Sequence, residues 1–116
     1  MPKEECLFCN IANRRIPAEI IAEAEGLVAV NDVRPQAPVH FLIFPLEHLP
    51  TIADATPKHA TLLGNAILLA NRIARERHIA PSGYRLVINC GAQAGQSVWH
   101  MHLHVLGGRS LAWPPG

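Results

Sequence analysis

The order of apolar and polar residues along the 116-residue chain predicts short strands separated by turns. Apolar runs rich in β-branched and aromatic residues favour the extended backbone, and glycine or proline separates one run from the next. The predicted strands cover residues 20–22, 27–30, 39–44, 84–90 and 98–106. Neighbouring runs are joined by turns, which favours a mainly antiparallel sheet.

One long amphipathic helix is predicted to begin at Thr56 and Pro57, because a hydroxyl caps a helix well and proline suits its first position. A shorter helix is predicted over residues 7–13. Together with the strands, the two helices indicate an α+β fold. We expect the apolar side of the long helix to cover a sheet. Its residues are Leu62, Leu63, Ala66, Ile67, Ala70, Ile73 and Ala74.

The last predicted strand alternates histidine with apolar residues. Side chains two apart share one face of a strand, so His100, His102 and His104 would point the same way. Histidine titrates near neutrality and serves as an acid, base, nucleophile or ligand. Serine or threonine would meet the needs of a merely wet strand face more simply, so this pattern favours chemistry. The opposite face would place four residues in the core: Trp99, Met101, Leu103 and Val105.

Composition narrows the class of protein. A hydrophobic share of 49% with only 16% charged residues excludes a disordered chain. The net charge is +1 and no basic run exceeds Arg14-Arg15, so a nucleic-acid polymer is not an expected partner. No apolar run approaches the roughly 20 residues that span a bilayer, and the N-terminus lacks a signal-like apolar segment. We expect a single domain over residues 1–116, a cytoplasmic location and no membrane partner.

The loop before the histidines carries groups suited to phosphate. Asn89 closes one predicted strand, and Gly95, Gln96 and Ser97 open the next. Glycine allows close backbone approach, and exposed N–H groups can receive phosphate oxygens. An ordinary glycine-rich hairpin is the alternative, but the adjacent histidines favour chemistry at phosphorus. A neutral imidazole can attack phosphorus, while a second imidazole and the loop donors hold the oxygen charge. A neighbouring histidine or serine could protonate the leaving group.

The run from Gly95 to Arg109 resembles the signature of the histidine-triad (HIT) family, in particular its nucleotide-binding (HINT) branch. Residues 31–41 and 83–89 and the closing Trp113-Pro114-Pro115-Gly116 are also similar, so the resemblance extends from about Cys6 to the end. It implies a five-stranded antiparallel sheet with one long and one short helix. It further implies a homodimer in which two sheets join into one of ten strands.

The resemblance also implies an activity: hydrolysis of purine nucleoside phosphoramidates, of the adenosine 5′-monophosphoramidase type. His102 would be the nucleophile, oriented by the carbonyl of His100, and the products would be a nucleoside monophosphate such as AMP and an amine. His104 would bind phosphate with Asn89, Gly95 and Ser97, and Asp32 would accept from the ribose hydroxyls. The purine pocket would comprise Phe8, Ile11, Ile16 and Val33, and Trp113 would reach the partner subunit's site.

Two other functions remain open. A dinucleoside polyphosphate hydrolase of the related branch would share the nucleophile, but the Gly107-Gly108-Arg109 ending and the tail favour the phosphoramidase. A nucleotide-binding regulatory module is the third reading. The intact triad weighs against binding as the sole role, because binding needs no nucleophile.

The cysteines suggest a second site. Three cysteines are present, and the pair Cys6-x-x-Cys9 indicates a metal or redox role in a reducing compartment. In some members of the wider family zinc is held by such a pair, a histidine before the long helix and the first triad histidine. The matching set is Cys6, Cys9, His48 and His100, which suits tetrahedral zinc in a structural role. Two buried free thiols are the alternative, with His48 then belonging to the active-site surroundings.

No cofactor is expected for the chemistry itself, and His40, His59 and His78 are interpreted as structural or exposed.

Overall fold

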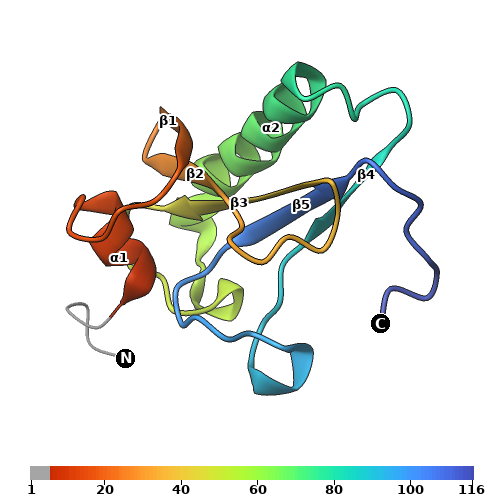
Figure 1. Ribbon diagram of the computed structural model, residues 1–116. Helices are drawn as coiled ribbons and strands as arrows, with labels where there is room; N and C mark the ends of the chain where they lie inside the picture. The colour runs from red at the N-terminus through yellow and green to blue at the C-terminus, as the bar shows by residue number, and fades with distance from the viewer. Residues whose placement is uncertain (1–5) are drawn as a thin grey trace.

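The computed structural model describes residues 6–116 and contains a five-stranded antiparallel sheet (Figure 1). The strand order across the sheet is β1-β2-β3-β5-β4, so the last strand lies between β3 and β4. The predicted α+β class with an antiparallel sheet is therefore confirmed. The strands are β1 Ile20–Ala24, β2 Leu27–Asn31, β3 Val39–Pro45, β4 Tyr84–Val87 and β5 Leu103–Gly107.

The central strands are buried on both faces, and their alternation divides the core in two. On β2 and β3, Ala29, Phe41 and Ile43 belong to one buried cluster. Their sequence neighbours Leu42 and Phe44 belong to a second cluster on the opposite face. Because successive side chains of a strand point to opposite faces, one apolar run supplies both layers of the core.

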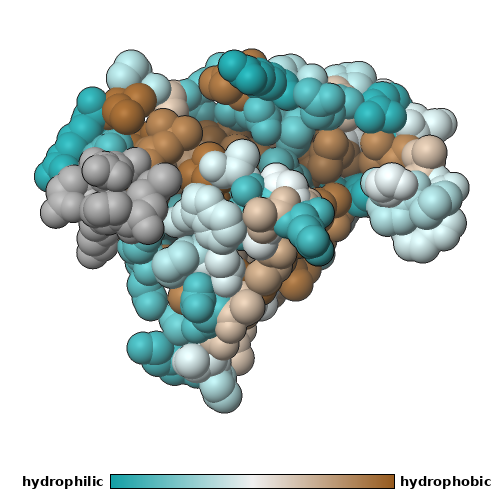
Figure 2. Space-filling view, turned by 90° about the horizontal axis from the view of Figure 1, so that it is seen from below, coloured by the Kyte–Doolittle hydropathy of each residue, from teal (hydrophilic) through white to brown (hydrophobic). Residues whose placement is uncertain are grey.

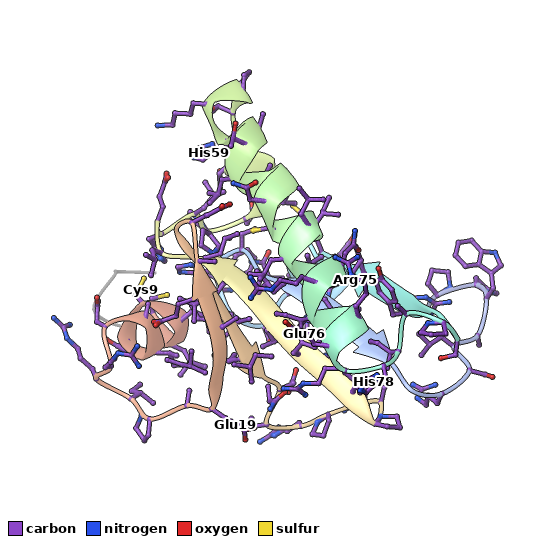
Figure 3. All side chains as sticks on the ribbon, turned by 90° about the horizontal axis from the view of Figure 1, so that it is seen from above. Cys9, Glu19, His59, Arg75, Glu76 and His78 are labelled. Atoms are coloured by element: carbon purple, nitrogen blue, oxygen red, sulfur yellow. The ribbon has the colours of Figure 1, made fainter. Side chains whose placement is uncertain are left out.

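Helix α2, Ala60–Glu76, covers the first of these faces (Figures 1 and 3). A 3-10 turn, Pro57–His59, precedes it, so the predicted start at Thr56 and Pro57 belongs to that turn. The expectation that Ile67 faces the sheet is wrong, since its side chain is 46% exposed. The buried stripe follows the three-to-four residue period, and its members are Ala66, Leu69, Ala70, Ile73 and Ala74. Within residues 6–116, none of the helices has the length and apolarity needed to cross a bilayer.

The opposite face of the sheet carries helix α1, Leu7–Ala12, which confirms the predicted short helix. The ring of Phe8 stacks on Phe44 with 4.5 Å between ring centroids. Cys6 and Cys9 are buried in the same layer. Figure 2 views this side of the molecule, where apolar residues lie between hydrophilic ones. A face covered only in part by a short helix leaves room for a ligand.

Two predicted strands are shorter than expected. Strand β4 ends at Val87 rather than at residue 90, and β5 begins at Leu103 rather than at residue 98. The ladder between β3 and β5 stops at the Ile43–Leu103 pair, and the N–H of Met101 instead donates to the carbonyl of Leu49 at 2.6 Å. Of the three histidines, only His104 lies on a regular strand. The other two stand on an irregular segment that places them deeper against α1.

Candidate active site and metal centre

A pocket of about 570 Å³ opens on the face that α1 covers only in part. Its apolar wall comes from α1 and the segment after it, and its polar wall comes from the end of β2 and the histidine segment. The pocket brings together most of the predicted site residues, which lie far apart in the sequence. These are Phe8, Ile11, Ile16, Asp32, Val33, Ser97, His102 and His104.

Gln96 does not face this pocket, because its side chain braces the loop. Its Nε2 donates to the carbonyls of Pro50 and Val98 at 2.7 and 3.1 Å, and its Oε1 accepts from the N–H of Gly91 at 2.9 Å. Each polar atom of the buried amide is therefore satisfied inside the protein. Ser97, the next residue, is the predicted loop residue that lines the pocket.

Three further predicted residues also stand apart from the pocket lining. Asn89 is partly buried in the segment after β4, and Trp113, 82% exposed, lies in the C-terminal tail. Gly95 is exposed, and its N–H donates to the carbonyl of Ala92 at 3.0 Å. That bond holds the glycine amide within the loop, and the phosphate-binding role expected for Gly95 stays a prediction.

His102 has the orientation that a nucleophile requires. Its Nδ1 lies 2.8 Å from the carbonyl oxygen of His100, and a carbonyl can only accept, so Nδ1 carries the proton. The lone pair is then on Nε2. Burial lowers the pKa of His102, although the hydrogen bond to His100 and the charge of Asp32 act in the opposite sense. The ring is therefore neutral near pH 7, and only a neutral imidazole can attack phosphorus.

Phe8 fixes the position of this ring. It meets His102 edge to face, with 4.9 Å between centroids and an interplanar angle of 77°. The same phenyl ring meets His100 in a second edge-to-face contact at 5.9 Å. Phe8 thus contacts two histidines while its own place is set by Phe44.

His104 has a partner that sequence reasoning missed. Its Nδ1 lies 3.0 Å from Nε2 of His40, which also lies 3.3 Å from Oδ2 of Asp32. His40 is 6% exposed. Its structural assignment was therefore incomplete, because it contacts two site residues. Burial, followed by the charges of His102 and His40, lowers the pKa of His104 to about 4.

The sequence contained part of the information needed to place His40 in the site. His40 and Leu42 alternate along β3, so they share a face, and Leu42 pairs with His104 of β5. A sequence shows which residues share a face of one strand. It does not show which strand lies beside it, and the whole of α2 and β4 lies between β3 and β5 in the sequence.

Two other histidines, His59 and His78, lie at the ends of α2, on the other side of the sheet (Figure 3). His59 is buried; its Nδ1 accepts from the N–H of Thr56 at 2.9 Å and its Nε2 lies 3.0 Å from Oε2 of Glu47. His78 is exposed. Both agree with the structural or exposed assignment given to them.

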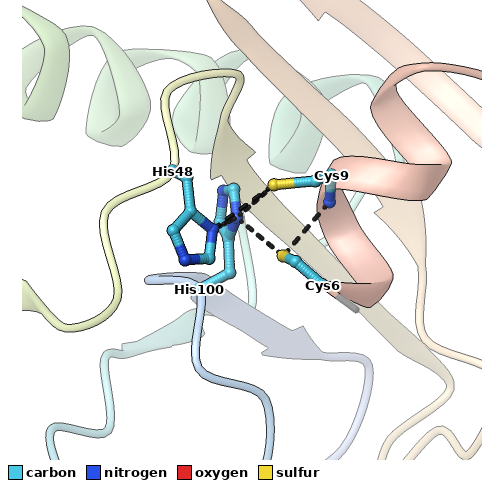
Figure 4. Close-up of side chains that lie close together, drawn as sticks. All are labelled: Cys6, Cys9, His48 and His100. Carbon is cyan, nitrogen blue, oxygen red and sulfur yellow. Dashed lines mark hydrogen bonds between the residues drawn. The ribbon is translucent and has the colours of Figure 1, made fainter. Parts of the chain in front are cut away.

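A second cluster lies behind the pocket, where α1 meets the segment after β3 (Figure 4). The Sγ of Cys6 is 3.2 Å from Nδ1 of His100, and the Sγ of Cys9 is 3.3 Å from Nδ1 of His48. The two Nδ1 atoms are 3.2 Å apart. All four potential ligand atoms lie within 4.8 Å of one another. The predicted set is therefore assembled by the fold.

The proton of His100 is placed away from this cluster. Its Nε2 lies 2.7 Å from the carbonyl oxygen of Pro45, so Nε2 donates and Nδ1 keeps its lone pair. Burial lowers the pKa of His100 to about 4, which keeps the ring neutral. A histidine ligand that donates its other N–H to a carbonyl is the arrangement usually found around metals.

The spacing of these atoms fits zinc. Tetrahedral zinc with bonds of about 2.0 Å to nitrogen and 2.3 Å to sulfur has edges of roughly 3.3 Å between nitrogens and 3.5 Å between nitrogen and sulfur. The nitrogen–nitrogen distance here is 3.2 Å, and three of the nitrogen–sulfur distances are 3.2 to 3.5 Å.

Comparison with known proteins places this geometry in a family. The model of the family described as "Scavenger mRNA decapping enzyme C-term binding" matches residues 5–112. A HIT-like protein from Synechococcus elongatus is 47% identical over 113 residues, covering 97% of this chain and 98% of that protein. The chain belongs to the histidine-triad (HIT) family. The HIT signature thus corresponds to the segment that carries His100, His102 and His104.

Solved structures agree with this assignment. The crystal structure of a HIT family hydrolase from Legionella pneumophila superposes with a TM-score of 0.94 at 46% identity, covering 97% of this chain and all of that one. A zinc-bound histidine triad family protein from Mycobacterium smegmatis has a TM-score of 0.80 at 32% identity, covering 94% of this chain and 78% of that one. The HIT fold, including its five-stranded antiparallel sheet and long helix, is therefore shared by this protein.

Proposed function

We propose that this HIT protein is a purine nucleoside phosphoramidate hydrolase of the nucleotide-binding branch. The observation that carries the proposal is the hydrogen bond from Nδ1 of His102 to the carbonyl of His100. It leaves Nε2 of a buried, neutral imidazole as the nucleophilic atom at the pocket. A site that served only to bind a nucleotide would not need this arrangement.

The pocket has room and chemistry for a nucleoside monophosphate unit. Its volume of about 570 Å³ lies within the usual range for small-molecule sites. The carboxylate of Asp32 offers acceptors for the two ribose hydroxyls. The purine would lie among Phe8, Ile11, Ile16 and Val33, and the phosphoryl group would lie near Ser97, His102 and His104. Val33 is 92% exposed, so it would gain most of its burial from the base.

The reaction would proceed in two displacements. Nε2 of His102 attacks phosphorus, the phosphorus–nitrogen bond breaks, and its electron pair leaves with the amine, which takes a proton from His104 or Ser97. A water molecule then attacks the nucleotidyl-His102 intermediate and gives its proton to the group, His104 or Ser97, that protonated the amine. The histidine returns as the leaving group and nucleoside monophosphate is released. Each step replaces one bond to phosphorus by another, and no oxidant or reductant is involved.

We further propose a structural zinc ion held by Cys6, Cys9, His48 and His100. Support comes from the spacing of their ligand atoms and from the zinc-bound relative. When bound, zinc would fasten α1 to the segments after β3 and before β5. The residues of the pocket, not the metal, would carry the chemistry, because His100 turns its ring away from the pocket toward the cysteines.

A homodimer is also part of the proposal. Ile67 and Leu68 of α2 are adjacent apolar residues, 46% and 64% exposed. Pairing of two copies would cover this surface and bring Trp113 of one copy toward the pocket of the other. Sedimentation that shows only monomer at micromolar concentration would contradict this assembly.

The deciding experiment is turnover of adenosine 5′-phosphoramidate by the wild type and by His102→Ala. We expect release of AMP by the wild type, its loss in the variant, and a nucleotidylated protein detectable by mass spectrometry after rapid acid quench. Equal turnover by both proteins would refute the nucleophile. A folded wild type that cleaves only dinucleoside polyphosphates, or that binds AMP without turnover, would replace the phosphoramidase assignment.

A further inference from the structure

Asp32, His40 and His104 form a second group of side chains that resembles a metal site. One ligand atom from each lies within 4.8 Å of the others. His40 is the buried member, and its Nε2 faces both Nδ1 of His104 at 3.0 Å and Oδ2 of Asp32 at 3.3 Å. Whether this group holds a metal or a proton depends on which nitrogen of His40 carries hydrogen.

A hydrogen bond from a backbone amide determines which nitrogen of His40 is protonated. The N–H of Gln36 donates to Nδ1 of His40 at 3.0 Å, so this nitrogen must present a lone pair. A neutral imidazole carries one proton, which is then on Nε2. The donor is held in place, because Nε of Arg109 donates to the carbonyl of Gln36 at 2.9 Å. Nε2 of His40 is therefore a donor and cannot bind a cation.

The proton on Nε2 of His40 also determines which nitrogen of His104 is protonated. Its Nδ1 faces the N–H of His40, so it must accept, and the single proton of the neutral ring is on Nε2. His104 therefore differs from His102, whose proton is on Nδ1. The two histidines that line the pocket offer it opposite functions, a lone pair from one and an N–H from the other.

We propose that His40 is a positioning residue that fixes the tautomer of His104, so that Nε2–H of His104 is directed at the phosphoryl oxygens and the leaving group. This inference rests on the proposed function and deepens it by assigning the proton-bearing atom. His40 itself touches no substrate. It shares its N–H between the residue proposed to bind ribose and the residue proposed to bind phosphate.

Two variants of His40 separate this role from a purely structural one. In His40→Gln the side-chain amide can still donate a hydrogen bond to His104, as Nε2–H of His40 does. The acceptor that Nδ1 of His40 offers to the backbone N–H of Gln36 is lost. In His40→Asn the shorter amide can still accept from Gln36, whereas the donor toward His104 is lost. His59→Gln is the matched control, since His59 is likewise buried and accepts a backbone N–H on Nδ1, but lies at the start of α2.

The first readout does not require activity. Imidazole ¹H–¹⁵N correlation spectra of the free protein at neutral pH should show His104 protonated on Nε2 in the wild type, in His40→Gln and in His59→Gln. In His40→Asn we expect a mixture of tautomers. The second readout is the rate of nucleotidylation with adenosine 5′-phosphoramidate. Loss of one fixed donor should lower that rate about tenfold in His40→Asn, with His40→Gln within about threefold of the wild type.

Several results would overturn the inference. One is a wild-type His104 protonated on Nδ1. Another is a nucleotidylation rate that falls equally in both His40 variants and in proportion to the fall in their melting temperatures. A third is a second equivalent of zinc, bound by the wild type and lost in His40→Asn, because it would make Nε2 of His40 a ligand. A wild type without turnover would refute the proposed function, whereas the tautomer spectra would still test the role of His40.

Discussion

The two histidine clusters contain similar groups but are built for different tasks. In the first, Nε2 of His100 donates to the carbonyl of Pro45, and its Nδ1 lone pair faces the cysteines. In the second, the N–H of Gln36 occupies Nδ1 of His40, so a proton faces His104. A carbonyl beside one ring and an amide beside the other decide which nitrogen keeps the proton. The types of ligand in a cluster therefore do not by themselves define a metal site.

Removing the metal should give the largest effect on stability. Cys6→Ser combined with Cys9→Ser should abolish zinc binding and lower the free energy of unfolding by several kcal/mol, because structural zinc contributes roughly 10 kcal/mol or more in small zinc domains. Metal analysis and thermal melts check this. Cys90→Ser is the control, since Cys90 is exposed and lies outside the cluster. Protein purified cleanly with less than about a tenth of an equivalent of zinc would contradict the metal site.

Phe8 tests whether the clusters are independent, because its ring contacts both His100 and His102. Phe8→Ala should destabilise the protein by about 3–4 kcal/mol, which is typical for loss of a buried aromatic ring. It should also weaken both zinc retention and AMP binding. Leu7→Ala, on the same helix but 40% exposed, should lower stability and zinc retention much less. Because Leu7 also lines the pocket, it is a control for those two measurements and not for AMP binding. Unchanged AMP affinity in Phe8→Ala would show that this ring does not form the base pocket.

Asp32 should affect only the second cluster. Asp32→Asn keeps the size of the side chain but removes the charge offered to the ribose hydroxyls. We expect AMP affinity to fall about tenfold, corresponding to about 1.4 kcal/mol, with zinc content unchanged. Isothermal titration with AMP and with 2′,3′-dideoxy-AMP checks the assignment, because only the ribonucleotide should be affected. Asp54→Asn, at an exposed turn, is the control.

Acid should give a further modest effect at the second cluster, which a variant of His104 isolates from that of His100, whose pKa is also about 4 in the fold. The pKa of His104 is about 4 in the fold, against 6.5 as the ordinary value, so below pH 6.5 the unfolded chain takes up a proton that the native ring refuses. Stability should therefore be complete above pH 6.5 and decrease as the pH falls toward 4. The groups facing this ring are Asp32, His40 and His102.

Urea unfolding of the wild type and of His104→Gln between pH 7 and 4 checks this sign. The difference between the two proteins should change by about 1–2 kcal/mol, less than the full shift implies, because the ring is partly exposed and water screens its charge. Comparing the two proteins also removes the contribution of acid release of zinc. Parallel curves would show that His104 ionises alike in the folded and unfolded states.

The sequence predicted which helices and strands exist better than it predicted the residues at which they begin and end. The apolar runs at residues 27–30 and 39–44 and the period of the long helix correctly placed the central strands and α2. The strand expected from residue 98 begins only at Leu103, because Met101 bonds to Leu49 instead of continuing the ladder. Likewise, Ile67 was assigned to the buried side of α2, since a helical pattern shows a stripe but not the line along which the sheet meets it.

Some features of the candidate site were likewise predictable from the sequence, and others were decided only by the fold. Residue types and spacing indicated that three histidines, a cysteine pair and a small-residue loop take part in chemistry, and predicted that His100, His102 and His104 would all face the same side. The tertiary structure alone decided that His100 turns to the cysteines, that Gln96 braces its loop and that His40 joins His104. The role of each imidazole depends on where its proton is held. The atoms that hold it belong to Pro45, Gln36 and the backbone of His100, which only folding brings into contact with these rings.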